Sequence, residues 1–344
     1  MRIALVNDMA MAIEALRYVL LRDGRHEIAW TAHNGVQAVN RCREDTPDLI
    51  LMDLVMPQMN GAEATREIMQ QTPCGILVVT ASVDTHGDLV YEAMGYGALD
   101  ATVTPAIGQD GNAAAATDLL DKIDRLGYIL GKSNAVQGSA YTVPPMIPSA
   151  QPKSLMPPLL AIGASTGGPQ AIATILGALP EDFPAAIVIV QHVDADFAAG
   201  FADWLNQRMA LEVRLASEGE IPAAGTVLIA GKDKHMRLSP AGRLTYTDEP
   251  THLINRPSVD VLFKSVADSW PAGGLGLLLT GMGRDGAEGL RFLRMKGWPT
   301  LAQDETSCIV YGMPKAAVEL DAVDEVLPLE MIAAALQRHL SQLA

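Results

Sequence analysis

The chain contains, at residues 159–172, the stretch LLAIGASTGGPQAI, in which an apolar run breaks into small residues and glycines around one serine, Ser165. An apolar run, a glycine-rich turn and an amphipathic segment in this order predict a β-strand followed by an α-helix. Gly163, Ser165 and Gly167 have the G-x-S-x-G spacing of a nucleophile elbow, a turn that exposes a serine at the end of a strand. The stretch therefore suggests a nucleophilic serine in an α/β domain.

Two other interpretations of this turn remain open from the local sequence. A glycine-rich turn before a helix can bind a phosphate through its free N–H groups. A dinucleotide-binding fingerprint, however, needs G-x-G-x-x-G and an acid about 20 residues later, whereas the next apolar run, AAIVIVQ, ends at His192. A P-loop needs a Gly-Lys-Ser/Thr ending, which this stretch lacks. The second interpretation left open is a serine with only a structural role in the turn.

Two residues that follow apolar runs are candidate partners for Ser165. A serine hydroxyl needs an adjacent base to take its proton, and His192 ends such a run. Asp285, in LLLTGMGRDGAEGL, follows another run and could orient the imidazole. His235 competes as the base, and Asp285 taken alone predicts a helix N-cap. Because the carboxyl ends of parallel strands meet at one edge, we expect Ser165, His192 and Asp285 in one crevice.

The second half of the chain predicts a doubly wound α/β domain. The runs LLAIGAS, AAIVIVQH, GLGLLLTGM and PTLAQD alternate with helical patterns from Leu159 onward. Three shorter runs, TVLIAG, HMRLS and RLTYT, lie between polar flanks in residues 226–247. Such short runs predict a small antiparallel hairpin inserted into the domain.

The first 130 residues show five βα units, with strands predicted at IALVN, IAWTA, LILMD, GILVVT and LDATVT. Five such units predict a flavodoxin-like, doubly wound, five-stranded parallel sheet. Residues 131–158 then lose all periodicity and gather Pro, Ser and Gly, as linkers do. We therefore predict an N-terminal domain at 1–126, a linker at 127–158 and a second domain at 159–344.

Composition limits the partners that the chain can have. The 344 residues are 49% hydrophobic and carry a formal net charge of −15, which predicts globular domains and argues against nucleic-acid binding. The three cysteines show no metal-ligand spacing, as in proteins of a reducing cytoplasm. We find neither a signal sequence nor an apolar run of the roughly 18–20 residues that a membrane helix needs. We expect a cytoplasmic monomer that reaches any membrane target from the cytoplasm.

Two acids in the first domain follow predicted strands, Asp8 after the first and Asp53 after the third. Carboxylates at one sheet edge suit Mg²⁺, although aspartates at strand ends also cap helices. Together, VND, LILMDLVMPQMNG, VVTAS and GALDATVTP resemble the receiver domain of two-component signalling proteins over its full length. The resemblance implies that Asp53 is the phosphoacceptor and Thr80 the switch hydroxyl. It also implies that Asp8, Asp53 and the backbone carbonyl of Val55 bind Mg²⁺.

Three positions depart from the receiver pattern. Asn7 stands where a second acid is usual, and Ala101 stands where an aromatic switch residue is common. Thr104 replaces the lysine that normally precedes the proline, and a threonine offers one neutral hydrogen bond instead of a point charge. These departures predict a receiver that keeps its acceptor but switches weakly, switches through other contacts or is constitutively active.

The second domain resembles the chemotaxis protein-glutamate methylesterases of the CheB family. The segments that carry this resemblance are IGASTGGP, IVIVQH, TGMGRDGAEG, NRPSVDVLF and QDETSCIVYGMPKAA. The resemblance implies that Ser165 attacks the γ-methyl ester of a receptor glutamate, with His192 as base and Asp285 orienting it. It assigns Met282 a backbone N–H in the oxyanion hole and Thr166 a positioning role. The family also deamidates receptor glutamines, and its hydrolysis needs no metal or organic cofactor.

The N-terminal sequences VNDMAMAIEALR, DTPDLILMDLVMP and QTPCGILVVT are most similar to the Wsp-type branch of that family, which serves a surface-sensing pathway. That similarity implies a methyl-accepting receptor as substrate, a CheA-like histidine kinase as phosphodonor and cyclic-di-GMP as the output of the pathway. Two alternatives come from other classes of function. One is a non-catalytic adaptor that titrates phosphate through Asp53, and the other is hydrolysis of a different ester or amide.

Overall fold

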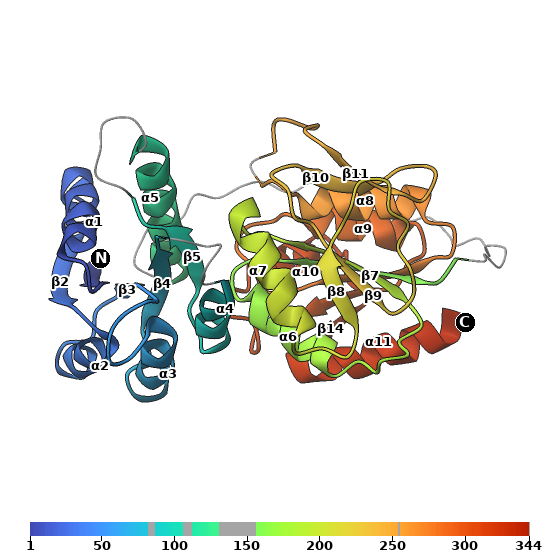
Figure 1. The fold of residues 1–344 in the computed structure, drawn as a ribbon. Helices are drawn as coiled ribbons and strands as arrows, with labels where there is room; N and C mark the ends of the chain where they lie inside the picture. The colour runs from blue at the N-terminus through green and yellow to red at the C-terminus, as the bar shows by residue number, and fades with distance from the viewer. Residues whose placement is uncertain (82–86, 106–111, 131–155, 254, 344) are drawn as a thin grey trace. The chain divides into compact units, whose positions relative to one another are not determined.

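Figure 1 shows the computed structural model, which describes residues 1–81, 87–105, 112–130, 156–253 and 255–343. Contacts between residues divide the chain into two compact units, Met1–Gln137 and Gly138–Ala344. Most of the predicted linker, 127–158, lies outside the described residues. The domain boundaries at 126 and 159 therefore stay predictions.

The first unit is a five-stranded parallel sheet with helices on both faces, as predicted. Its strand order, β2-β1-β3-β4-β5, is that of a flavodoxin-like doubly wound sheet. One face carries α1 and α5, and α2 and α3 pack side by side on the other (Figure 1). The strands are β1 (Arg2–Val6), β2 (Glu27–Ala32), β3 (Leu49–Met52), β4 (Gly75–Thr80) and β5 (Asp100–Val103); the helices are α1 (Ala10–Asp23), α2 (Gly35–Glu44), α3 (Gly61–Gln71), α4 (Gly87–Gly95) and α5 (Asn112–Ile129).

Local sequence signals explain where these elements begin and end. The strands β3 and β4 are buried throughout, as expected for inner strands of a parallel sheet covered on both faces. The helix α3 begins at a capping box, in which Asn60 and Glu63 each accept a hydrogen bond from the other's backbone N–H. The helix α1 ends at Gly24, whose φ of 70° provides a left-handed cap. The capping box therefore fixes the end of the loop that joins β3 to α3.

The second unit is a seven-stranded parallel sheet in the order β14-β13-β12-β6-β7-β9-β8. The helices α8 and α9 pack together on one face, and α6 and α11 pack together on the other (Figure 1). The strands β10 and β11 form a separate antiparallel pair. The strands are β6 (Leu159–Ala164), β7 (Ala186–Gln191), β8 (Glu212–Leu215), β9 (Thr226–Ile229), β10 (His235–Leu238), β11 (Leu244–Thr247), β12 (Gly274–Leu278), β13 (Thr300–Gln303) and β14 (Glu325–Leu327); the helices are α6 (Gly168–Gly177), α7 (Ala195–Asn206), α8 (Val259–Ser269), α9 (Ala287–Met295), α10 (Met313–Glu319) and α11 (Leu329–Leu343).

One prediction for this unit is wrong in part. The hairpin consists of β10 and β11 alone, because the run TVLIAG forms β9 of the main sheet, parallel to β7 and β8. Its residues Val227, Leu228 and Ile229 are fully buried, so its short length and polar flanks concealed an inner strand. The sequence also lacks a clear signal for β8 and β14, which are short and partly exposed edge strands.

The order of the strands places a topological switch point beside β6. From β6 the chain moves outward through β7 to β8 and β9, and it then returns to place β12 on the other side of β6. The carboxyl ends of β6 and β12 therefore flank the topological switch point of the sheet, where open α/β sheets bind their ligands.

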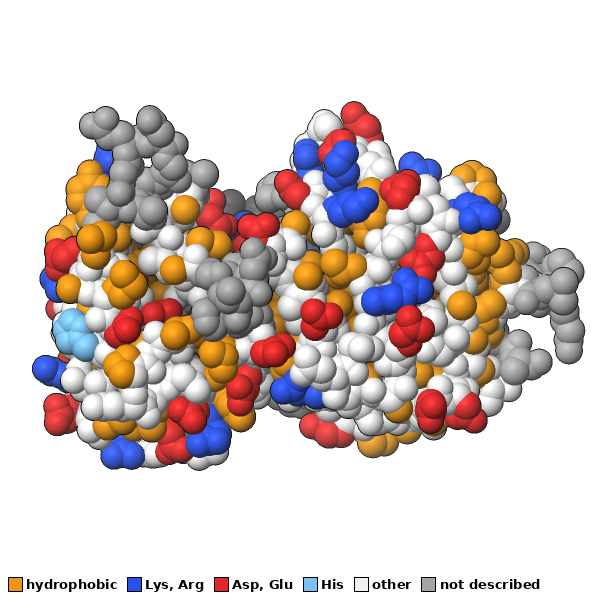
Figure 2. Space-filling view, viewed as in Figure 1, with side chains coloured by type: hydrophobic (Ala, Val, Ile, Leu, Met, Phe, Trp, Pro, Cys, Tyr) orange, Lys and Arg blue, Asp and Glu red, His pale blue; other side chains and the backbone are white. Residues whose placement is uncertain are grey.

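Acidic and basic side chains are interspersed over the visible faces of both units (Figure 2). Each unit has its own apolar core. Across the described ranges, no helix combines the length and the apolar character needed to cross a membrane.

Candidate active site

The three groups predicted for hydrolysis all follow strands that surround the switch point. Ser165 follows β6, His192 follows β7, and Asp285 lies between β12 and α9. Because β6 is the direct neighbour of both β7 and β12, the carboxyl ends of these strands open on the same edge of the sheet. The topology therefore brings three segments far apart in the sequence to one edge of the sheet.

The turn that carries Ser165 is held on both sides. The Ser165 N–H donates a hydrogen bond of 3.0 Å to the carbonyl oxygen of Thr280, in the segment after β12. Gly167 has a φ of 79°, in the left-handed region that favours glycine, and a Cβ there would lie 2.7 Å from Cβ of Ile309. The helix α6 begins at the next residue. Ser165 thus lies in a tight turn before the positive end of a helix dipole.

A buried glutamine connects the backbones of the serine and the histidine. Nε2 of Gln191 donates to the carbonyl oxygen of Ser165 at 2.9 Å and to that of His192 at 3.1 Å. The side chain is 3% exposed, so water does not compete for these two acceptors. Gln191 therefore fixes the end of β7 relative to the turn after β6.

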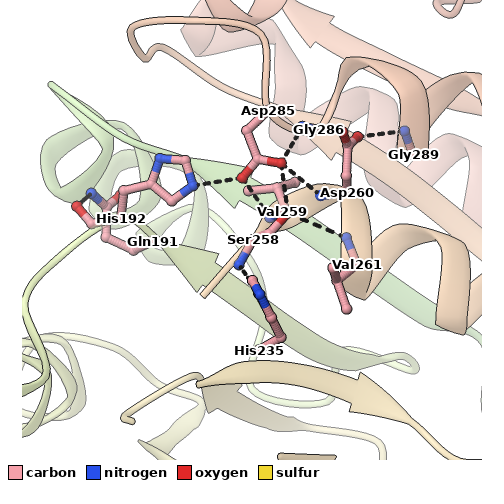
Figure 3. Close-up of polar contacts among 10 residues, drawn as sticks. All are labelled: Gln191, His192, His235, Ser258, Val259, Asp260, Val261, Asp285, Gly286 and Gly289. Atoms are coloured by element: carbon pink, nitrogen blue, oxygen red, sulfur yellow. Dashed lines mark hydrogen bonds and ion pairs between the residues drawn. The ribbon is translucent and has the colours of Figure 1, made fainter. Parts of the chain in front are cut away.

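The structure brings His192 and Asp285 into direct contact. Nε2 of His192 lies 2.8 Å from Oδ2 of Asp285 (Figure 3), and the side chains are 14% and 10% exposed. Since Nε2 meets the carboxylate, Nδ1 is the ring nitrogen left to act as a base. The hydrogen bonds of the described residues do not include one between the Ser165 hydroxyl and this ring. Catalytic hydrogen bonds of this kind often tighten only when substrate binds.

The Asp285 carboxylate is surrounded by hydrogen-bond donors. Besides the His192 ring, it accepts hydrogen bonds from Ser258 Oγ (2.8 Å), Asp260 N–H (3.0 Å) and Gly286 N–H (3.1 Å) at Oδ1, and from Val259 N–H (2.8 Å) at Oδ2. Burial by itself would raise the pKa of Asp285. The hydrogen bond and charge of His192, followed by the other donors, outweigh burial and hold the pKa at about 2. Asp285 is therefore an anion at any pH at which the protein would work.

The position of Asp285 differs in part from the simple N-cap that its local sequence predicts. It precedes α9 in the chain, yet two of its donors are the first backbone N–H groups of α8 (Figure 3). A carboxylate at the N-terminus of a helix is stabilised by the free N–H groups and by the helix dipole. Asp285 therefore joins α8 to the loop before α9.

His235, the competing histidine, does not contact the serine turn. It lies on β10 and is fully buried, and its Nδ1 accepts a hydrogen bond of 3.1 Å from the Ser258 N–H. Its Nε2 lies 3.3 Å from the carbonyl oxygen of Pro250, which accepts. His235 therefore holds the backbone of Ser258 through Nδ1 (Figure 3).

A second carboxylate lies beside the first. Oδ1 of Asp260 accepts a hydrogen bond of 2.6 Å from the Gly289 N–H of α9. Burial, and then the negative charge of Asp285, raise the pKa of Asp260 to about 6. The pKa of Asp260 thus lies above the ordinary value for an aspartate, and the pKa of the neighbouring Asp285 lies below it.

The residues predicted for the oxyanion hole and for positioning, Met282 and Thr166, lie in segments that adjoin the serine turn. The carbonyl oxygen of Thr166 accepts a hydrogen bond of 2.9 Å from Thr280 Oγ1. Met282 follows Gly281, and Gly281 packs so closely on the serine that a Cβ there would lie 2.7 Å from Ser165 Cβ. Both residues therefore belong to the segments that touch the serine turn.

In the first unit, the predicted receiver residues lie at the carboxyl ends of the inner strands. Asp53 follows β3 and is 8% exposed, Asp8 follows β1 and is exposed, and Thr80 ends β4 and is buried. Val55, two residues after Asp53, is 46% exposed. The neighbouring strands β1, β3 and β4 place these residues along one edge of the sheet.

The departures from the receiver pattern have structural consequences. The Thr104 N–H donates to the Thr80 carbonyl oxygen at 2.9 Å, and Thr104 Oγ1 is buried with no hydrogen-bond partner among the described residues. The buried side chain of Asn7 accepts a hydrogen bond of 2.8 Å from the Met9 N–H, so it shapes the start of α1. Ala101 is buried on β5. Within the described ranges, no group of three or more His, Cys, Asp or Glu side chains is arranged to hold a metal ion.

Sequence reasoning missed several polar residues that support the site. Besides Gln191 and Ser258, these include Gln303, whose Oε1 accepts a hydrogen bond of 2.9 Å from the Thr280 N–H. Gln191 and Gln303 each end an apolar strand, and a polar residue at the end of a buried run was the available signal. Ser258 had no comparable signal, because it acts through a loop 27 positions further along the chain.

The geometry defines an α/β domain with a serine elbow and a histidine-aspartate pair, joined to a receiver-type sheet. Residues 160–336 match the family model of the CheB methylesterase, and residues 3–107 match that of the response regulator receiver domain. The chain belongs to the CheB methylesterase family.

Relatives support this assignment along the whole chain. "Protein-glutamate methylesterase/protein-glutamine glutaminase 3" of Pseudomonas aeruginosa is 51% identical over 97% of this chain and 98% of its own. "Protein-glutamate methylesterase/protein-glutamine glutaminase 2" of Pseudomonas syringae pv. syringae is 53% identical over 97% of both chains. The crystal structure of the Thermotoga maritima CheB methylesterase catalytic domain is 34% identical, with a TM-score of 0.50, and covers 54% of this chain and 100% of that one. The confirmed family thus agrees with the fold and with the resemblance of both halves.

Proposed function

We propose that this chain is a response-regulator carboxylic ester hydrolase, a protein-glutamate methylesterase that also deamidates glutamines. Its substrates are γ-methyl esters of glutamate on chemoreceptor-like membrane proteins. The observation that carries the proposal is the 2.8 Å contact between His192 and Asp285 beside the Ser165 elbow, in a chain of the CheB methylesterase family.

The proposed reaction begins with attack of Ser165 Oγ on the ester carbonyl carbon. Nδ1 of His192 takes the serine proton, while the anionic Asp285 holds the ring and stabilises its cation. The resulting oxyanion is stabilised by the Met282 backbone N–H, with Thr166 as a positioning residue. The imidazolium then protonates the departing methoxide, so that methanol leaves and an acyl-enzyme remains. Water, deprotonated by the same ring, releases the glutamate; from glutamine, the leaving group is ammonia.

The receiver unit is proposed to control this reaction through Asp53 as phosphoacceptor and Thr80 as switch hydroxyl. The donor set of Asp8, Asp53 and the Val55 carbonyl consists of oxygen atoms and therefore fits Mg²⁺. When bound, Mg²⁺ would neutralise charge during phosphoryl transfer. The unpartnered buried hydroxyl of Thr104 supplies a donor for a phosphoryl oxygen in place of the usual lysine.

The proposed partners follow from the family and from the N-terminal sequence. A methyl-accepting receptor is the substrate and a CheA-like histidine kinase is the phosphodonor, and both are reached from the cytoplasm. The resemblance of the first 80 residues favours a Wsp-type, surface-sensing pathway. Deletion of the protein in its host should then change cyclic-di-GMP levels rather than swimming reversals, and the opposite result would assign the chain to chemotaxis.

The first experiment is methanol release from methylated receptor membranes by the purified full chain. Ser165→Ala should release no methanol, and a small phosphodonor should change the wild-type rate if the receiver switches. A chain starting near Leu159 should be faster than the full chain if the unphosphorylated receiver inhibits it, whereas equal rates would refute inhibition. If neither wild type nor Ser165→Ala releases methanol, the non-catalytic adaptor becomes the better interpretation.

A further inference from the structure

Among the described residues, the Asp285 carboxylate has two side-chain partners: the ring of His192 and the hydroxyl of Ser258 (Figure 3). Its remaining donors are backbone N–H groups, which side-chain substitution leaves in place. The Ser258 hydroxyl donates to Oδ1, the oxygen opposite to the one that meets the histidine. It therefore restricts rotation of the carboxylate about the Cβ–Cγ bond of Asp285. Such a rotation would carry Oδ2 away from His192.

Ser258 is itself held from behind. It is 1% exposed, and its N–H donates to Nδ1 of the fully buried His235. The Pro250 carbonyl can only accept, so Nε2 of His235 is the protonated nitrogen and Nδ1 is free to accept. Hydrogen bonds thus run from β10 through Ser258 and Asp285 to His192.

We propose that Ser258 is a positioning residue that orients Asp285, and through it His192, so that Nδ1 of the ring faces Ser165. The inference rests on the proposed serine mechanism but not on the methyl ester as substrate. Loss of the hydroxyl removes one of three donors at Oδ1 and leaves a less restrained and less neutralised carboxylate. The charged form of the His192 ring is then stabilised more strongly, but the orientation of the ring is less restrained.

The test uses a fluorophosphonate that labels activated serines, applied to the full chain over a range of pH. At the pH optimum of the wild type, Ser165 of the Ser258→Ala variant should be labelled at least 10-fold more slowly than Ser165 of the wild type. The pH midpoint of labelling should move upward, because an Asp285 carboxylate with fewer donors stabilises a neighbouring positive charge more strongly. A purely structural loss would lower the labelled fraction without moving that midpoint.

Ser265→Ala is the matched control, because Ser265 lies on α8, the helix that Ser258 caps, and its hydroxyl donates to the Leu262 carbonyl and accepts from the Leu238 N–H. It should label like wild type. Ser258→Thr, which keeps the hydroxyl, should recover the wild-type midpoint. An unchanged rate and midpoint in Ser258→Ala would overturn the proposal, as would a wild-type chain that is not labelled at Ser165. Labelling without methanol release would instead refute the substrate and leave Ser258 in its role.

A second, independent observation concerns two cysteines of the first unit. Sγ of Cys42, in the last turn of α2, lies 3.9 Å from Sγ of Cys74, which is partly exposed just before β4. The Thr72 hydroxyl donates to Cys42 Sγ at 3.4 Å. The hydrogen bond from Cys74 lowers the pKa of Cys42, and burial opposes this shift. The two sulfurs are therefore already in contact, and Cys74 is the more exposed of the two.

We also infer that Cys42 and Cys74 form a disulfide when the protein meets a hydroperoxide. A thiolate attacks the peroxide oxygen, the O–O bond breaks, and an alkoxide or hydroxide leaves and takes a proton, giving a sulfenic acid. The second thiol then attacks the sulfenic sulfur, the S–O bond breaks, and water leaves with the thiol proton. The sulfurs must then approach from 3.9 Å to about 2.05 Å.

This inference is tested by treating the full chain with hydrogen peroxide, alkylating the free thiols and mapping the peptides. A linked Cys42–Cys74 peptide should dominate and disappear on reduction, while Cys308, in the other unit, is alkylated. Cys308→Ser should still form the link, and Cys42→Ser and Cys74→Ser should each prevent it. Alkylation of both residues, or their separate conversion to sulfinic acids, would overturn the inference.

Discussion

His192 meets Asp285 through Nε2 and not through Nδ1, with 2.8 Å between the nitrogen and Oδ2. The ring nitrogen nearer to its own backbone is thereby left for the serine. In the proposed mechanism, this orientation makes a hydrogen on Nε2 a condition for catalysis, since only then can Nδ1 accept the serine proton. Changes that alter which nitrogen carries the hydrogen should therefore be more damaging than changes that merely weaken the contact.

The first prediction concerns Asp285→Asn. An amide NH₂ facing Nε2 would force the hydrogen onto Nδ1, so that the ring could no longer take the serine proton. We expect kcat for methanol release to fall by about 10⁴. The amide would also leave the Val259 N–H without its acceptor, at a cost of about 1–3 kcal/mol in the free energy of unfolding. A loss of activity below about 10-fold would contradict the assigned orientation.

The second prediction concerns pH and stability at Asp260, whose pKa is raised to about 6 from 3.8. The folded state binds the proton more tightly than the unfolded state, so ionisation of Asp260 destabilises the fold above pH 6. This penalty fades as the pH falls from 6 toward 3.8. Asp260→Asn should remove it, raising the free energy of unfolding at pH 8 by roughly 1–3 kcal/mol, with little effect near pH 4.

The measurement for Asp260→Asn is the thermal unfolding midpoint of the full chain at both pH values. Asp268→Asn is the matched control, because Asp268 lies on the same helix in an exposed pair with Lys296, and such pairs contribute little. If Asp260→Asn is no more stable than wild type at pH 8, burial does not penalise the ionised Asp260 carboxylate.

The third prediction separates two effects of replacing a glycine by alanine in the serine turn: backbone strain, and a steric clash of the added Cβ. Gly167→Ala combines a φ of 79° with a Cβ placed 2.7 Å from Ile309, whereas Gly219→Ala has a φ of 80° and no atom within 4 Å of its Cβ. Both should lose about 1–2 kcal/mol of stability from strain. Only Gly167→Ala should also displace the turn and lower methanol release, by at least about 10-fold. Equal activities would show that the turn tolerates the extra carbon.

The fourth prediction addresses the receiver unit. A Cβ on Gly61 would lie 2.0 Å from the carbonyl oxygen of Asp53, so Gly61→Ala must shift the segment that carries the acceptor. We expect it to abolish labelling of Asp53 by a small phosphodonor while Ser165 still reacts with a fluorophosphonate. Gly24→Ala, with open space around its Cβ, should keep both reactions. Normal phosphorylation of Gly61→Ala would contradict the rigidity inferred for this loop.

The sequence predicts the parts of this protein that depend on local patterns. The strands β6 and β7 are uninterrupted buried apolar runs, and residues directly after such strands meet at the sheet edge whatever the rest of the chain does. That rule places Ser165 and His192 together, whereas Asp285, at the far end of the loop after β12, was selected as well for the chemistry that a serine and a histidine need. The run TVLIAG was misplaced, because whether a short strand joins a sheet or a hairpin depends on partners distant in sequence.

Contacts between distant loops could not be predicted for the same reason. Ser258 lies in a polar loop and acquires its role only because α8 packs beside the loop before α9. Which ring nitrogen of His235 carries the hydrogen likewise depends on the carbonyl of Pro250, 15 positions away. Neither relationship produces a periodicity or a motif that a single sequence displays.

The placement of Asp285 at the start of α8 affects which site residues would be lost first in relatives that evolve to lose hydrolysis. A descendant that abandoned hydrolysis could replace Ser165 by another small residue with little effect on folding. It could not discard Asp285 as easily, because two helix N–H groups and a buried hydroxyl would lose their acceptor. Among inactive relatives, the aspartate should therefore outlast the nucleophile. In a newly sequenced homologue, the serine reports chemistry, whereas the aspartate alone reports only a folded domain.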